Sequence, residues 1–345
     1  MSIISPIKFD TLVNEAVDTL PKRTKIVVAR RFGLKNGKRE TLEAIGRDYD
    51  ITRERVRQIE NDALRQLSRE EVLSQLSPAF TYLEDHFKEY GNVRAEEKIL
   101  EHLSGEAHPH PRRQAILFVL TLGDKFVHES ESDAYHAHWV TDEASRRKMT
   151  DMVTHLIAKL QETQYRTWEE EELLNAAKAY VGMDDRTARS YLEISKEIGS
   201  NVFGQFGLTQ WPEITPAGVR DKAYLVMRRE GKPLHFSGIT ERINQAKFSD
   251  RKAYVQTVHN ELIKDKRFVL VGRGLYALSE WGYTPGTVRD VLAEVLKEKG
   301  PLTKEEVVEE TLKRRMVRPN TIVLNLQNPK FFIRVEGGKY ALANS

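Results

Sequence analysis

The sequence predicts a mainly α-helical protein, in which an N-terminal helix-turn-helix precedes tandem winged-helix units of three helices and a β-hairpin each. Three observations support this fold class. Apolar residues recur every three or four positions through residues 9–67, as on one face of an amphipathic helix. Two of the predicted helices there are joined by a short turn, as in a helix-turn-helix. Farther along, helical stretches repeatedly end in alternating apolar residues around a glycine turn, which is typical of a hairpin.

The first domain is expected to contain four helices. The first covers residues 9–20, and its apolar face consists of Phe9, Leu12, Val13, Ala16, Val17 and Leu20. Residues 22–32 form the second, with Ile26, Ala29 and Phe32 facing inward and Gly33 ending it. The last two begin at threonine caps, Thr41 and Thr52. The helix after Thr52 carries one apolar stripe, made of Val56, Ile59, Ala63 and Leu67.

The outward face of that last helix carries side chains that can read base edges. Arg53, Glu54 and Gln58 lie in its first turns, and arginine pairs with guanine, glutamine with adenine and glutamate with the cytosine amine. The preceding stretch from Pro21 to Arg39 holds eight basic residues and no acidic one, which suits phosphate contacts and includes Arg31. The alternative interpretation is an ordinary solvated charged face.

These residues resemble region 4 of primary-type bacterial sigma factors over about residues 7–76. The resemblance rests on the runs KIVVARRFGL at 25–34, TLEAIG at 41–46 and ITRERVRQIE at 51–60. It implies recognition of the −35 promoter element and binding to the β flap of bacterial RNA polymerase. By resemblance, Arg53, Glu54 and Gln58 contact bases. The phosphate contacts implied in the same way are Thr41, Leu42 through its backbone, Arg55 and Arg57.

The C-terminal part of the chain contains an internal repeat. The segments TPAGVRD at 215–221 and TPGTVRD at 284–290 each open an amphipathic helix, and both units end in a hairpin pattern. The unit at 214–283 resembles the HARE-HTH family in its runs LIKDKRF at 262–268 and GRGLYAL at 272–278. That family includes the folded domain of the polymerase delta subunit and modules of chromatin and restriction proteins. The resemblance implies a winged-helix adaptor for DNA or protein.

Residues 77–213 show the same order of elements without a recognisable family. Predicted helices near 80–90, 95–103 and 110–122 precede a possible wing at 126–140, and three more precede apolar residues at 202–208. We therefore expect five domains: the helix-turn-helix at 1–76, winged helices at 77–143 and 144–213, a HARE-type winged helix at 214–283 and a second, HARE-like one at 284–345.

Net charge and residue composition exclude several kinds of functional site. Formal net charge is +3 in 345 residues, so a nucleic-acid surface must be a local patch. Cysteine is absent, which excludes disulfides, thiolate metal sites and cysteine nucleophiles. We expect no signal peptide, no membrane span and a cytoplasmic location.

Six histidines gather between 102 and 138, but their spread over loops and a hairpin argues against a metal site. Without a phosphate loop or hydrolase motif, we expect no enzyme and no cofactor.

The sequence therefore favours a transcription factor that binds promoter-like double-stranded DNA and bacterial RNA polymerase. The chain shows no aromatic, basic block of the kind that captures single-stranded DNA, so we expect it to be accessory to initiation. Two alternatives stay open. In the first, the protein is an adaptor that regulates polymerase without reading DNA sequence. In the second, it is the DNA-targeting subunit of a restriction or defence system.

Overall fold

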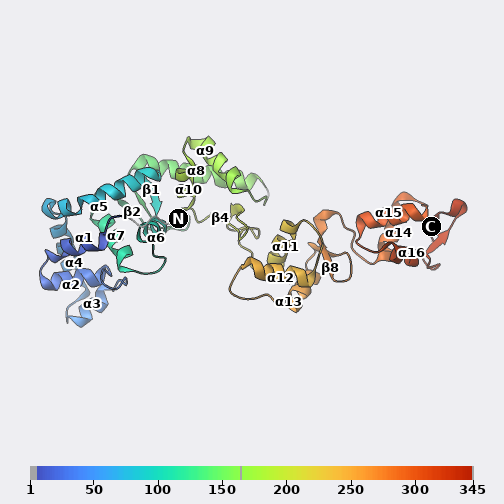
Figure 1. The fold of residues 1–345 in the computed structure, drawn as a ribbon, viewed down its shortest axis with the longest axis horizontal. Helices are drawn as coiled ribbons and strands as arrows, with labels where there is room; N and C mark the ends of the chain where they lie inside the picture. The colour runs from blue at the N-terminus through green and yellow to red at the C-terminus, as the bar shows by residue number, and fades with distance from the viewer. Residues whose placement is uncertain (1–5, 164, 344–345) are drawn as a thin grey trace. The chain divides into compact units, whose positions relative to one another are not determined.

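The computed structural model describes residues 6–163 and 165–343 (Figure 1). Its contacts divide the chain into two compact units. One runs to residue 199 and includes residues 206–209, and the other holds residues 200–205 and the chain from 210 onward.

The first unit opens with the predicted helix-turn-helix domain. Its helices are α1 (Phe9–Asp18), α2 (Lys22–Arg31), α3 (Leu42–Asp48) and α4 (Arg53–Leu67). Both predicted caps are confirmed, because Thr41 Oγ1 accepts from Ala44 N and Thr52 Oγ1 accepts from Arg55 N, each at 3.1 Å. One prediction is wrong. Ile26 is 40% exposed, because α2 turns Val27 and Val28 inward instead, whereas Ala29 and Phe32 are buried as predicted.

A winged helix follows directly. Its elements are α5 (Glu70–Glu89), β1 (Val93–Ala95), α6 (Glu96–Ser104), α7 (Pro111–Leu122), β2 (Val127–Glu129) and β3 (His138–Val140). The strands form an antiparallel sheet in the order β1-β3-β2, with both Val93 and Val127 opposite Val140. The predicted helices and wing are therefore present. The boundary expected between residues 76 and 77 falls inside α5, which runs through it without a break.

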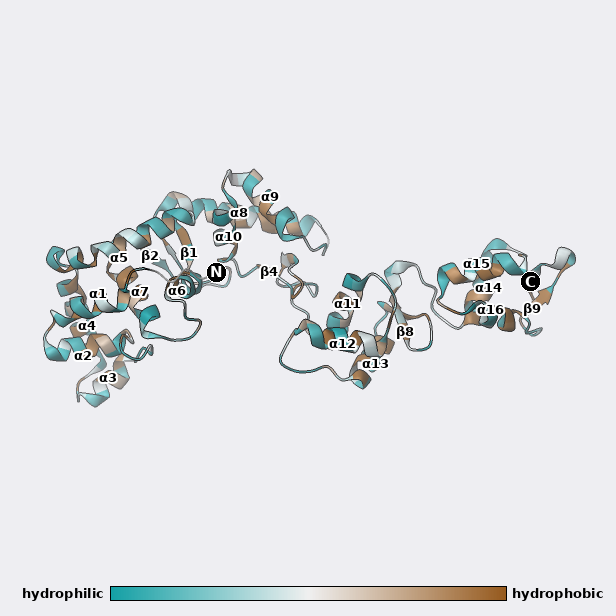
Figure 2. Cartoon of the chain, in the orientation of Figure 1, coloured by the Kyte–Doolittle hydropathy of each residue, from teal (hydrophilic) through white to brown (hydrophobic). Residues whose placement is uncertain are grey.

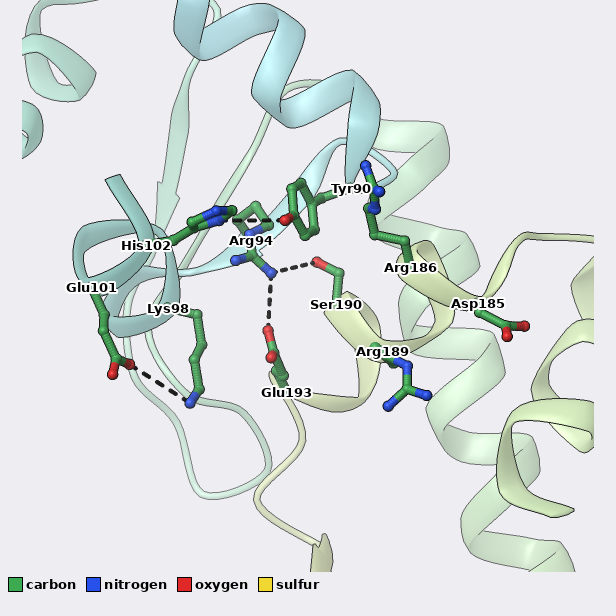
Figure 3. A pocket seen from close by; sticks show the side chains of 10 residues that line it. All are labelled: Tyr90, Arg94, Lys98, Glu101, His102, Asp185, Arg186, Arg189, Ser190 and Glu193. Carbon is green, nitrogen blue, oxygen red and sulfur yellow. Dashed lines mark hydrogen bonds and ion pairs between the residues drawn. The ribbon is translucent and has the colours of Figure 1, made fainter. Parts of the chain in front are cut away.

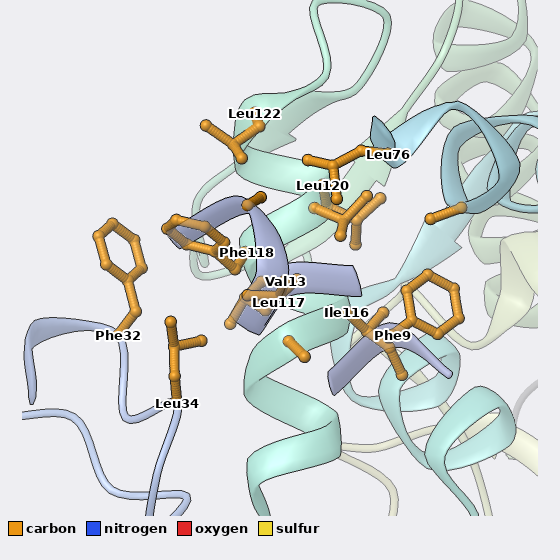
Figure 4. Close-up of a cluster of buried hydrophobic side chains, with 14 of the residues drawn as sticks. Phe9, Val13, Phe32, Leu34, Leu76, Ile116, Leu117, Phe118, Leu120 and Leu122 are labelled. Atoms are coloured by element: carbon orange, nitrogen blue, oxygen red, sulfur yellow. The ribbon is translucent and has the colours of Figure 1, made fainter. Parts of the chain in front are cut away.

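Helix α7, the third helix of this winged helix, lies in a core shared with the helix-turn-helix domain. Every residue from Ala115 to Leu122 except Thr121 is hydrophobic and buried, so this part of α7 is enclosed, whereas the first turn of the helix is polar, with Arg112, Arg113 and Gln114 (Figure 2). Its neighbours in this core include Phe9 and Val13 of α1, Phe32 after α2, and Leu76 of α5 (Figure 4). Residues from both sides of position 76 thus stabilise one another.

The second winged helix completes the first unit. It contains α8 (Glu143–Glu162), α9 (Glu170–Val181), α10 (Asp185–Leu192) and a two-stranded sheet of β4 (Ile198–Ser200) and β5 (Phe206–Leu208). A single bridge between Trp168 and Phe206 stands where β1 stands in the first winged helix.

The second unit repeats this order of elements twice. The first copy consists of α11 (Val219–Glu230), β6 (Leu234–His235), α12 (Phe236–Ala246), α13 (Val255–Lys264), β7 (Phe268–Leu270), β8 (Leu275–Leu278) and the 3₁₀ turn η1 (Ser279–Trp281). The second consists of α14 (Val288–Lys299), α15 (Lys304–Arg314), α16 (Pro319–Leu326), β9 (Phe332–Arg334), η2 (Glu336–Gly338) and β10 (Tyr340–Leu342). Each copy buries its own apolar cluster.

The repeated segments at 215–221 and 284–290 cap the helices that follow them differently. Gly218 and Thr287 hold the same place in the two repeats, one residue before the helix. Thr287 forms a capping box with Asp290, whereas Gly218 has no side chain with which to cap α11. The three helices and hairpin predicted for each copy are confirmed, and a tandem of winged helices follows the helix-turn-helix.

Candidate nucleic-acid interface

The turn between α3 and α4 sets the angle of the second helix. Asp50 takes a positive φ of 49°, and Ile51 N donates to Gly46 O at 2.9 Å, which closes the turn. A Cβ on Gly46 would lie 2.6 Å from Ile51 O, so glycine is required for this close approach. Thr52 then starts α4 with a side-chain cap.

A small apolar cluster holds α4 against α2 and α3. Val27, Ile45 and Val56, one from each helix, are fully buried, and Ile59 packs partly buried against them. This packing orients α4, so Arg53, Glu54 and Gln58 are exposed on the opposite face. The structure therefore brings together the three residues predicted to contact bases.

Each of these three side chains already has a partner on the protein. Arg53 Nη1 lies 2.9 Å from Glu43 Oε1 of α3, and Arg55 Nη1 donates to Gln58 Oε1 at 3.0 Å. Glu54 accepts from Arg57 Nη2 at 2.6 Å and from Arg57 Nε at 2.9 Å, and these hydrogen bonds lower the pKa of Glu54. All are exposed pairs, which contribute little to stability and exchange readily for another partner.

The predicted phosphate contacts divide into two groups. Thr41, Arg55 and Arg57 are exposed at the N-terminal ends of α3 and α4, and Leu42 begins α3, where helix N–H groups suit an anion. Arg31 differs, because its Nε donates to both Glu60 carboxylate oxygens at 3.2 and 3.3 Å and its Nη1 donates to Glu40 O at 3.2 Å. Arg31 thus joins α2 to α4 as well as carrying charge.

Sequence reasoning missed the role of Arg30. Its guanidinium donates to Glu40 at 3.0 and 2.6 Å and to Asp48 at 2.5 Å, and these carboxylates raise the pKa of Arg30. The bonds tie the end of α2 to the loop before α3 and to the end of α3. The only sequence signal was its place in the basic stretch, which Arg30 shares with seven other cations.

The third helices of the four winged helices differ in what they expose. Helix α7 is buried from Ala115 to Leu122 except at Thr121, so most of its length has no face for a DNA groove. In α10, Arg186 and Arg189 form ion pairs with Glu89 and Glu170. Helix α13 exposes Gln256, Thr257 and Asn260, whereas α16 contains no basic residue. Helices α10 and α13 therefore both expose polar side chains, as α4 does, and in α10 as in α4 the exposed arginines are paired with glutamates.

Charge is distributed unevenly along the chain. Residues 77–213 contain 15 lysines and arginines and 24 aspartates and glutamates, and residues 214–345 contain the reverse, 24 and 15. An acidic surface repels a polyanion and a basic one attracts it. This distribution favours DNA contacts at the two ends of the sequence over contacts in its middle.

The histidines between 102 and 138 have individual structural roles. His110 Nδ1 accepts from Arg112 N at the start of α7, and His138 Nδ1 lies 2.8 Å from His136 O. His128 lies 3.1 Å from Glu96. Over the residues that the structure describes, no three His, Asp or Glu side chains are grouped as metal ligands would be.

Within the same residues, no helix is long and apolar enough to cross a membrane.

Comparison with known proteins identifies two parts of the chain. Residues 16–69 match the family model for sigma-70 region 4. Residues 219–281 match the HARE-HTH family, a helix-turn-helix domain whose description names ASXL and restriction endonuclease proteins. The chain therefore joins a DNA-binding helix-turn-helix of the sigma-70 type to a HARE-HTH domain, as the sequence predicted.

Curated relatives match the first part alone. The RNA polymerase sigma factor SigA of Listeria monocytogenes is 49% identical over 55 residues, which are 16% of this chain and 15% of that protein. SigA proteins from a Bacillus species and from Lactococcus lactis subsp. cremoris are 47% and 46% identical over the same length and shares. The chain thus spans about 15% of the length of these sigma factors.

Proposed function

We propose that this protein, which joins a sigma-70 region 4 helix-turn-helix to a HARE-HTH domain, is a non-enzymatic, cytoplasmic accessory factor of bacterial transcription initiation. Helix α4 enters the major groove of a −35-type element, where Arg53, Glu54 and Gln58 contact bases. Thr41, Leu42, Arg55 and Arg57 hold the flanking phosphates, and Arg31 adds charge behind them. The observation that carries the proposal is the exposed row of base-reading side chains on a helix fixed by a buried cluster.

A second part of the proposal is association with RNA polymerase through its β flap. The matched relatives are named as RNA polymerase sigma factors, and their similarity covers the helix-turn-helix domain. The basic residues of 214–345 then add contacts along the same DNA, since a tethered second site raises the effective concentration of the first.

Affinity purification of the full chain from cells, with sequencing of the bound DNA, tests both parts. Polymerase subunits together with a shared −35-like motif are the expected result. Polymerase without a motif would replace this proposal with an adaptor that does not read sequence. A motif without polymerase would favour the DNA-targeting subunit of a defence system. The matched control is the Arg53→Ala chain, which should keep polymerase and lose the motif.

A further inference from the structure

A cleft of about 650 Å³ lies between the first winged helix and the second (Figure 3). Tyr90 and Arg94 line it from the end of α5 and from β1, and α6 contributes Lys98 and His102. Helix α10 forms the other wall with Arg186, Arg189 and Ser190, and Glu193 follows directly after it. This volume is in the range of protein sites for small molecules.

The walls of the cleft are held together without a ligand. Ser190 Oγ donates to Val93 O and Tyr191 Oη donates to Gly91 O, both at 2.7 Å, so α10 is bonded to the segment that leads into β1. A Cβ on Gly91 would overlap with Thr187 Cγ2, which shows how closely α10 approaches this segment. The cleft is therefore preformed.

Arg94 is a buried cation with unused hydrogen-bond donors. It is only 4% exposed, and its hydrogen bonds, to Glu193 at 2.9 Å and to Ser190 at 3.3 Å, both come from Nη1. Its Nε is buried without a partner, and the guanidinium lies 4.1 Å from the ring centre of Tyr90. Burial lowers the pKa of Arg94. Because an unmade hydrogen bond at a buried charge is costly, an acceptor oxygen entering here would be bound favourably.

Three further cations surround this guanidinium at the rim. Lys98 lies 3.9 Å from Glu101, and Arg186 and Arg189 pair with Glu89 and Glu170. All three basic side chains are about half exposed, so these pairs are weak surface contacts that an anion can replace. Cations from both winged helices thus face one cleft.

The surroundings select a small anion over a nucleic acid. Residues 77–213 have nine more acidic than basic residues, and this excess repels an extended polyanion. Inside the cleft, a small molecule meets four basic side chains, Arg94, Lys98, Arg186 and Arg189, which outnumber the three acidic ones, Glu101, Asp185 and Glu193. Tyr90 Oη and His102 Nδ1, 3.3 Å apart, add neutral hydrogen-bonding groups beside the charged ones.

We propose that this cleft binds a small phosphate-bearing ligand of about mononucleotide size. Arg94 holds a phosphate oxygen at the floor, and Lys98 and Arg186 close on the phosphate from the two walls. Because the two walls belong to different winged helices, the bound ligand strengthens the link between them. The site is independent of DNA recognition by α4.

Isothermal titration calorimetry of the full chain with ADP, and separately with inorganic phosphate, tests the site. We expect saturable binding of ADP with one site per chain and a higher melting temperature in its presence. The double substitution Lys98→Ala/Arg186→Ala should weaken binding at least ~10-fold, because it removes two charge-assisted contacts. Arg94→Lys, which keeps the buried charge but loses the planar set of donors, should weaken it as well.

The matched control is Lys148→Ala, which removes an exposed cation of α8 that does not line the cleft. It should bind ADP as the parent does. Equal loss in the control and the double variant, or no binding of ADP or phosphate at millimolar concentration, would overturn the proposal. The proposal would likewise be overturned if a DNA duplex competed with ADP for binding and the double substitution Lys98→Ala/Arg186→Ala abolished this competition. That result would assign the cleft to a phosphate of the DNA backbone.

Discussion

The rings of Phe32 and Phe118 meet edge to face with their centres 4.8 Å apart, although 85 residues separate them in the sequence. Phe32 follows α2 of the helix-turn-helix, and Phe118 lies at the middle of α7. Both are buried in the cluster that contains Phe9, Val13 and Leu76. The helix-turn-helix domain therefore depends on the third helix of the neighbouring winged helix for part of its core.

The first prediction follows from this contact. Phe118→Ala should destabilise the first unit by about 3–5 kcal/mol, since it leaves a cavity in a shared core. Hydrogen exchange should show lower protection in α1 and α2 as well as in α7. The control is Phe331→Ala, a 38% exposed phenylalanine of the second unit, which should leave that exchange unchanged. Loss of protection confined to residues 77–143 would show that the two domains fold separately.

The second prediction concerns base reading. Arg53→Ala in the full chain should cost about 1–3 kcal/mol on a specific duplex and relax preference at one or two positions. Arg57→Ala should weaken specific and scrambled duplexes alike and reduce the salt dependence, as loss of a phosphate contact does. Fluorescence anisotropy on both duplexes at several salt concentrations measures this. Binding by Arg53→Ala that matches the parent on both duplexes contradicts the base assignment.

The third prediction separates two neighbours on α4. Ile59 packs partly buried against Val56, so Ile59→Ala should lower the free energy of unfolding by about 1–2 kcal/mol, less than the loss for a fully buried isoleucine. Gln58→Ala should hardly change it, because Gln58 is exposed. Chemical denaturation of both variants gives the comparison. Equal losses would mean that α4 is rotated about its axis.

How much the sequence predicted depends on how local the determining interactions are. The threonine caps at 41 and 52 and the stripe on α4 act within a few residues, and they predicted the helices and the exposed face of α4. The face of α2 was mispredicted at Ile26, because four apolar residues in a row, 26–29, do not define a single helical face. Arg31 was assigned by charge alone, and its bonds to Glu60 and Glu40 needed the fold.

Two other features depend on contacts between distant segments. Helix α7 is apolar from Ala115 to Leu122 except at Thr121, and such a pattern shows burial without showing which neighbour covers the helix. The cleft joins Arg94 to Glu193, about a hundred residues later, and no spacing rule relates these positions. Both features arise from how helices pack, which periodicity within one helix cannot show.

The fourth prediction concerns pH. Burial lowers the pKa of His86 to about 3, with smaller contributions from the nearby Arg94 and His102. The unfolded chain binds a proton at this histidine below about pH 6.5, whereas the folded chain stays unprotonated down to about pH 3. The free energy of unfolding therefore falls as pH is lowered through this window.

His86→Phe keeps an aromatic ring beside Phe87 and Tyr90 and removes the titrating group. Between pH 6.5 and 5 the parent should lose about 1–2 kcal/mol more stability than this variant. Urea denaturation at both pH values measures the difference. Parallel losses in parent and variant would contradict the assignment of His86 as a buried neutral imidazole.

The last prediction concerns the division of work with polymerase. Contacts of region 4 with duplex DNA position a protein on the double helix without separating its strands. Opening requires exposed aromatic side chains on which the freed bases stack, and the exposed face of α4 carries arginine, glutamate and glutamine instead. Core polymerase with this protein alone should therefore yield no run-off transcript from a linear promoter. When a primary sigma factor is added, a run-off transcript should appear. The amount of that transcript should change with this protein and stay the same with its Arg53→Ala variant. Run-off from core polymerase and this protein alone would show that the chain is a complete initiation factor.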